Sequence, residues 1–517
     1  MYMSRVRRFQ TLFLMVFIVS LSIFPSACGQ EPVQGAKTPI AGKIPTRQAT
    51  SFSLSLAAHP QVLASATASS TSTATSGATT ATNTTTSQSA AAANAPSTIA
   101  GAPPGPVPSG AGTIPAAFPH YFSFGVMSSP GGAGDLDSMR SSNGATFAFR
   151  YQYLSGGTNT GHGWETWNQP AGQFATYYMQ DSDQHGYIPT FVYYELCQTD
   201  GPHPGTYCGG HDGEQDSGNI ANPASMNAYF TNWALLMEKI HDFGKPVLVI
   251  VEPDLWGFLQ HASNNTDNAA NVPASVSSSG YAAAAAYPNT AQGFAWTMLH
   301  IRDLHASNAI LALHASPWAA GVDIASDTRA DLDVGAVVQK ETNFLNSAGL
   351  VGNPAGVSGW DLLSNDVADH DAGQINGYTW WDRYNRTFPN FARYLDYIGR
   401  LSQATHHRVV MWQVPIGNQY FDTMNNTPGH FQDNRAEYIL GNPASFAAAG
   451  IIAVLFGPGN GGTMNVDAAH DGVTNPAPIS SYECDHCNTH ASSYPDDDGG
   501  FLRLFIGQYM QHPVPLS

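Results

Sequence analysis

The chain is poor in charge and especially poor in cations. Charged residues make up 11% of the 517 residues, and 20 Lys and Arg face 38 Asp and Glu, which gives a net charge of −18. Polyanions and acidic membrane surfaces bind through clustered cations, so this balance excludes nucleic acid and anionic lipid as expected partners. Phe, Trp and Tyr also make up 11% of the chain, which favours a neutral polar partner.

Long apolar runs are also missing, apart from one near the amino terminus. Residues 11–24 are apolar and follow three arginines. This run is shorter than the roughly 20 residues that span a bilayer, but it is typical of a secretory signal. The residues before Cys28 resemble a bacterial lipobox, although Pro25 stands where leucine is usual. Segment 1–28 therefore predicts an extracellular or cell-surface protein whose one expected membrane contact is a lipid anchor at Cys28.

The next segment, 29–113, lacks the apolar residues of a core. It consists largely of Ser, Thr, Ala, Gly and Pro, which bury too little apolar area to offset the loss of backbone entropy. We predict a disordered spacer there. Residues 114–517 are enough for one large single-core domain.

Cysteine is scarce, and its four remaining copies form two close pairs. They are Cys197 with Cys208, and Cys484 with Cys487. An even number in an exported chain predicts two local disulfides. Two histidines near the second pair leave a zinc site as the alternative there.

Residues 114–517 contain apolar runs of strand length that alternate with helical patterns. Most of these runs are continuous, as in parallel strands that are covered on both faces. Eight of them with helices between predict a (β/α)8 TIM-barrel-like domain, with an open doubly wound sheet as the alternative. The runs are 121–126, 145–153, 188–196, 247–251, 309–314, 360–364, 408–414 and 451–456, and the clearest helical patterns are 226–243, 292–307 and 388–403.

The fourth run ends in a pair of acids, and the candidate site is built around it. Glu252 and Asp254 flank Pro253, which cannot donate a ladder hydrogen bond and therefore ends the strand. In parallel α/β enzymes, the carboxyl ends of the strands form the catalytic mouth. A helix-capping role is the alternative for a single acid of this kind.

Other strand ends also carry acids, amides and aromatic residues. Glycosidic cleavage needs two carboxyl groups beside the scissile bond, together with aromatic faces against which sugars pack. The predicted acids are Glu195, Glu252, Asp254 and Asp366. The predicted substrate-binding residues are Arg150, Tyr151, Tyr153, Tyr194, Trp256, His314, Trp318, Trp380, Trp381, Trp412, Gln413 and Asn418.

Four short segments are similar to glycoside hydrolase family six, the cellobiohydrolases and endoglucanases. LVIVEPDLWGFL (248–259) resembles the family's acid segment, and this resemblance implies that Asp254 is the proton donor. PTFVYYELC (189–197) looks like a shortened form of a second segment, with Glu195 in it. NAILALHASPWAAG (308–321) lacks the family's Asp, and MWQVPIGNQ (411–419) lacks its Lys and Glu. The family's barrel is irregular and without a full set of strands, so eight runs depart from it.

These patterns together predict a glycoside hydrolase that acts on a neutral oligo- or polysaccharide without a metal or organic cofactor. Asp254 is the expected general acid, with Glu252 raising its pKa, and Asp366 or Glu195 is the expected base. Gln413 stands where a retaining barrel enzyme would carry its nucleophile, so inversion is favoured. The alternatives are a non-catalytic carbohydrate-binding protein and a metal-dependent hydrolase that uses Asp366, Asp369, His370 and Asp371.

Overall fold

The computed structural model describes residues 112–128, 130–199, 208, 212–352, 356–367, 381–414, 435–457 and 501–517. The predicted signal segment with Cys28 lies outside these residues, as do the pair Cys484 and Cys487 and all but the last two residues of the 29–113 spacer. Within the described ranges, every helix is too short or too polar to cross a membrane.

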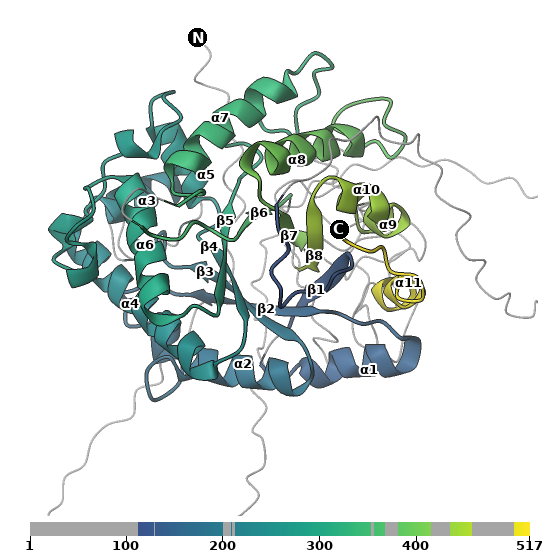
Figure 1. Cartoon of the computed structure of the whole chain (residues 1–517), viewed down its shortest axis with the longest axis horizontal. Coiled ribbons are helices and arrows are strands. Elements are labelled where there is room, and N and C mark those ends of the chain that lie inside the picture. The colour runs from purple at the N-terminus through teal and green to yellow at the C-terminus, as the bar shows by residue number, and fades with distance from the viewer. Residues whose placement is uncertain are drawn as a thin grey trace, which may run out of the picture. The chain divides into compact units, whose positions relative to one another are not determined.

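Eight parallel strands close into a barrel in chain order, which confirms the predicted fold class. Helices surround the strands (Figure 1). The strands are β1 Ser123–Met127, β2 Phe149–Ser155, β3 Ile188–Tyr194, β4 Val247–Val251, β5 Ala309–His314, β6 Leu362–Asn365, β7 Val409–Val414 and β8 Ile451–Phe456. β1 closes the barrel by pairing with both β2 and β8.

The predicted runs and the observed strands agree closely. The runs at 247–251, 309–314 and 451–456 have the bounds of β4, β5 and β8. The largest difference is in the second run, because residues 145–148 precede β2 and only Phe149 begins to pair with β1.

The helices alternate with the strands. The predicted helices at 226–243, 292–307 and 388–403 correspond to α4, α6 and α8. The helices are α1 Ala133–Asn143, α2 Gln173–Gln184, α3 Asp212–Ile220, α4 Pro223–Phe243, α5 Leu255–Ala262, α6 Ala291–His305, α7 Val334–Ser347, α8 Phe391–Thr405, α9 Arg435–Gly441, α10 Pro443–Ala448 and α11 Phe501–Tyr509.

Local signals set the bounds of α4. The Asn222 side chain accepts hydrogen bonds from the backbone N–H groups of Ala224 and Ser225, and Pro223 occupies the first turn. The first N–H groups of a helix have no partner within it. The Asn222 side chain accepts from two of them, and Pro223 has no N–H group that needs a partner, so both residues favour a helix start. Gly244 ends the helix in the left-handed conformation that glycine adopts readily.

Side chains of the strands alternate between two buried layers. In β4, Leu248 and Ile250 belong to the apolar cluster inside the barrel, whereas Val247, Val249 and Val251 pack outward with the helices. Both layers are apolar, which explains why the strand sequences are continuous rather than alternating. We call the region outside the strands the outer layer, and the opening at their carboxyl ends the mouth.

Candidate active site

The backbone is strained where β4 and β7 end. Glu252 and Asp254 have φ angles of 46° and 68°, and Gln413 at the end of β7 has a φ of 51°. Residues other than glycine rarely adopt a positive φ angle, and each such residue costs about 1–3 kcal/mol of folding free energy. Strain of this kind gathers at functional sites, so its place at the mouth makes the mouth the candidate site.

Four side chains from β5, β6 and β7 form a polar cluster in the mouth. His314 Nδ1 lies 3.2 Å from Ser364 Oγ and 3.3 Å from Trp412 Nε1. On the other edge of the ring, His314 Nε2 lies 3.6 Å from Asp366 Oδ1. The histidine is fully buried, whereas the Asp366 side chain is 14% exposed. Asp366 therefore retains access to a substrate or a water molecule.

Two tyrosines of β2 extend this cluster. The Tyr153 hydroxyl donates a hydrogen bond to Gln413 Oε1, and both Tyr151 and Tyr153 pack edge-on against Trp412. Tyr151 is fully buried and its hydroxyl has no hydrogen-bond partner. A Cβ on Gly457 would lie 1.7 Å from the Tyr151 hydroxyl, so only glycine fits there. Burial raises the pKa of Tyr151 well above its usual value, and the charge of Asp366 adds to this.

Asp254 lies on the β3–β4 side of the mouth. It precedes α5 as the N-cap residue, but its side chain caps none of the N–H groups of that helix, which disfavours the capping alternative. Burial raises the pKa of Tyr194 well above its usual value, and the next largest cause is the charge of Asp254. Tyr194 and Asp254 therefore interact electrostatically.

Trp318 packs on the outer face of α5 and is partly exposed. Its ring packs against Phe258, with 4.8 Å between ring centroids and 52° between the ring planes. A Cβ on Gly257 would lie 2.6 Å from the Trp318 ring, so glycine at that position permits the contact. The partly exposed ring still suits the predicted role of a sugar platform.

Glu252 does not face the mouth. Its Oε1 accepts hydrogen bonds of 3.1 Å from the backbone N–H groups of Glu195 and Leu196, and its carboxyl also interacts with the Tyr229 hydroxyl of α4. It is fully buried, and burial raises its pKa to about 7. The positive φ turns Glu252 out of the strand's alternation, so this placement does not fit the predicted tuning of Asp254.

Glu195 also lies in the outer layer. Its side chain is fully buried. Burial raises its pKa well above the usual value, and the charges of Glu252 and Glu165 add to this. A general base must be ionised and must reach water, so this placement does not fit the predicted base.

Two further predicted binding residues are structural. Arg150 faces α2, with Nη1 2.6 Å from Asp181 Oδ2 and its guanidinium over the Tyr178 ring. Trp381 is buried, and its Nε1 donates to the Ala325 carbonyl at 2.9 Å. Neither placement fits contact with a substrate.

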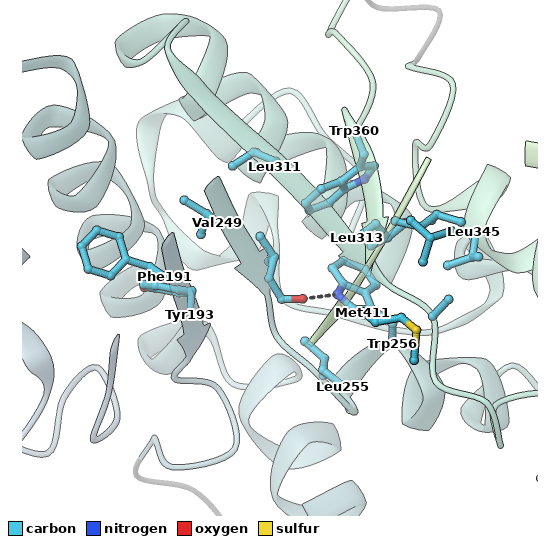
Figure 2. Packing of buried hydrophobic residues seen from close by; sticks show 14 of the residues in the cluster. Phe191, Tyr193, Val249, Leu255, Trp256, Leu311, Leu313, Leu345, Trp360 and Met411 are labelled. Atoms are coloured by element: carbon cyan, nitrogen blue, oxygen red, sulfur yellow. Dashed lines mark hydrogen bonds between the residues drawn. The ribbon is translucent and has the colours of Figure 1, made fainter. Parts of the chain in front are cut away.

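Trp256 is the third predicted binding residue with a structural position. Figure 2 shows it packed among Leu313, Leu345 and Trp360, and a dashed line marks its hydrogen bond to a carbonyl. Trp256 Nε1 donates to the Val251 carbonyl at 3.0 Å. The ring is 1% exposed, so it cannot serve as a sugar platform.

Some predictions fall outside the described residues, and some site residues were not predicted. Trp380 and Asn418 lie outside them, as do Asp369, His370 and Asp371 of the metal-dependent alternative. Ser364 and Gly457 were not predicted, although both occupy strand-end positions that the barrel frame points to. Asp216 was also missed; it is buried on α3, and burial raises its pKa well above the usual value.

The Cys197–Cys208 disulfide is formed, as predicted. Within the described ranges, the one group of His, Cys, Asp and Glu side chains close enough to hold a metal consists of these two cysteines and Asp212. A disulfide cannot supply the thiolates that bind a metal, so these residues do not fit a metal site.

Comparisons with known proteins return similar solved structures only. No protein-family model and no curated protein matches the chain. An endo-beta-1,4-mannanase double mutant of Cellulomonas fimi is 12% identical, covers 67% of this chain and 68% of that chain, and has a TM-score of 0.39. A beta-mannanase from a symbiotic protist of the termite Reticulitermes speratus is 12% identical and has a TM-score of 0.34. The match covers 77% of this chain and 92% of that chain.

A third similar structure is a Bacteroidetes-affiliated GH5 cellulase, which is 10% identical, covers 77% of this chain and 97% of that chain, and has a TM-score of 0.39. At these values the likeness concerns the architecture alone.

The predicted resemblance to family six is wrong. Three of the similar structures carry a family in their names, and these are a GH26 domain, a GH5 cellulase and a GH30 endoxylanase. The barrel itself is closed and has all eight strands, unlike the incomplete barrel of family six. The short EPD segment misled because a buried strand that ends in acids recurs in many parallel α/β folds.

Proposed function

We propose that this protein is a glycoside hydrolase that cleaves a neutral polysaccharide with Asp254 and Asp366. The observation that supports it is the placement of these two carboxyl groups at the ends of β4 and β6, on either side of β5. The other two predicted acids are buried in the outer layer, which leaves this pair. Tyr153 and Trp318 are partly exposed aromatic groups against which sugar rings pack well.

The amide at the end of β7 favours inversion. Inverting enzymes hold their carboxyl groups about 6.5–9.5 Å apart to admit a water molecule, whereas retaining enzymes hold them about 5–5.5 Å apart. β7 ends in the amide Gln413, which cannot act as a nucleophile. Asp254 then protonates the leaving oxygen, and Asp366 takes a proton from the attacking water.

The substrate class follows from charge. The net charge of −18 and the acids at the mouth repel acidic glycans. A neutral glycan carries no such penalty, and its hydroxyls can bond to the Tyr153–Gln413 pair.

The first experiment measures reducing-end release from neutral and acidic glycans by the purified protein. We expect release from at least one neutral glycan and none from the acidic ones. The anomeric configuration of the fresh product, followed by proton NMR, should be inverted. Retention would overturn the proposed pairing. Sugar binding without release from any glycan would favour a non-catalytic carbohydrate-binding protein.

Export is a further part of the proposal and rests on segment 1–28 alone. Mass spectrometry of the protein from a bacterial host should find the amino terminus cleaved before or near Cys28. An acyl group on that cysteine would show a lipid anchor, and an intact Met1 would contradict export.

A further inference from the structure

The hydrogen bonds around His314 determine which ring nitrogen carries the proton. Trp412 Nε1 lies 3.3 Å from His314 Nδ1, and an indole N–H can only donate. Nδ1 must therefore accept, and the ring proton lies on Nε2. That nitrogen has no hydrogen-bond partner of its own, and it faces Asp366 Oδ1 at 3.6 Å.

We infer that His314 is a positioning residue for Asp366, and that Trp412 sets its tautomer. The inference rests on the proposed function, in which Asp366 is the base. His314 is held rigidly, because it is fully buried, packs edge-on against Trp412 and contacts Ser364. Its Nε2–H therefore points in a fixed direction.

This arrangement orients the carboxylate. Nε2–H attracts Oδ1, which leaves Oδ2 of Asp366 for the attacking water. The 3.6 Å separation is slightly longer than a hydrogen bond, and such contacts tighten when substrate binds. A carboxylate without this donor turns about its side-chain bonds, and a misplacement of about 1 Å costs roughly 10²-fold in rate.

Two substitutions of His314 test the roles of Nδ1 and Nε2 separately. The amide of His314→Gln reaches the place of Nε2 and can still donate to Asp366. The shorter amide of His314→Asn reaches the place of Nδ1, so it keeps an acceptor for Trp412 but loses the donor. On a glycan that the wild type cleaves, we expect His314→Asn to lower kcat about 10²-fold with KM nearly unchanged, and His314→Gln to retain most of kcat. Exposed His512→Asn is the control and should behave as wild type.

A purely structural role predicts something else. Both variants would then lose melting temperature and kcat together. Equal kcat in His314→Gln and His314→Asn, at equal melting temperatures, would overturn the inference.

A spectroscopic arm does not depend on turnover. The ¹⁵N shifts of labelled histidine distinguish a protonated Nε2 from a protonated Nδ1, and the His314 signal is assigned by its loss in His314→Gln. We expect the Nε2–H tautomer in the wild type and a mixture of tautomers in Trp412→Phe, where the indole donor is gone. An Nδ1–H tautomer in the wild type would overturn the inference. If no glycan is cleaved while the Nε2–H tautomer is found, the proposed function fails and the geometry around Asp366 stands.

Discussion

The two sides of the barrel mouth use acidic residues in opposite ways. On the β5–β7 side, Asp366 keeps 14% of its side chain exposed beside a buried histidine. On the β3–β4 side, Glu195 and Glu252 follow the strands just as directly but are buried in the outer layer. Only Asp254 on that side stays near the mouth. A strand-end acid is therefore a candidate catalyst only if its backbone aims it inward.

The acids buried on the β3–β4 side destabilise the folded protein when they are ionised. Their burial disfavours the charged form, and the charge of Glu252 adds to the raised pKa values of Glu195 and Asp216. On the β5–β7 side, His314 Nδ1 is close to Ser364 Oγ and Trp412 Nε1, and Asp366 is partly exposed. The first region should therefore control the pH dependence of stability, and the second should control turnover.

The largest expected effect tests this division directly. Asp366→Asn should lower turnover roughly 10²–10⁴-fold, the usual contribution of a positioned acid or base, with little change in melting temperature. Asp254→Asn should do the same. Glu195→Gln, the matched change in the outer layer, should leave kcat unchanged and raise the melting temperature at neutral pH. Loss of activity in Glu195→Gln but not in Asp366→Asn would reverse the two sides.

The second effect concerns stability against pH. The folded pKa of Glu252 is about 7, against an ordinary value of 4.5. The folded state therefore keeps a proton that the unfolded state has already lost, and stability falls as pH rises from 4.5 to about 7. At about 1.4 kcal/mol per pH unit, the loss is about 3 kcal/mol. Denaturant titrations across this window should show the slope, and Glu252→Gln should flatten it. An unchanged slope would mean that Glu252 titrates normally.

A smaller effect is expected in the outer layer beside β2. Arg150→Met removes the pair with Asp181 and the contact with the Tyr178 ring. Hydrogen bonds to charged groups contribute about 1.5–3 kcal/mol, so unfolding free energy should fall by about 2 kcal/mol. The kcat and KM of the protein that remains folded should not change. A raised KM at unchanged stability would show that Arg150 takes part in substrate binding.

The smallest effect is expected in the mouth. Tyr153→Phe removes the hydrogen bond to Gln413, which contributes about 1 kcal/mol. We expect KM to rise about fivefold with kcat nearly unchanged, because the pair serves binding rather than chemistry. Matched Tyr229→Phe, on α4 in the outer layer, should change stability and leave KM as it is.

The sequence by itself determined the barrel and the place of the mouth. Parallel strands covered on both faces must be apolar throughout, so eight continuous runs were visible without any structure. The ends of those runs located Asp254, His314, Asp366 and Gln413. The disulfide between Cys197 and Cys208 could also be predicted, because two cysteines close in sequence in an exported chain favour a disulfide.

Only the tertiary structure decided which way these side chains point. Continuous apolar strands carry no alternation that separates inside from outside, so Trp256 and Trp412 look alike in sequence. Trp256, on α5, packs outside the strands, whereas Trp412 belongs to the cluster inside the barrel. Glu252 is in phase with the inward residues of β4, yet a φ of 46° turns it outward. That angle is imposed by the contacts of the folded barrel, because no local preference of a glutamate favours it.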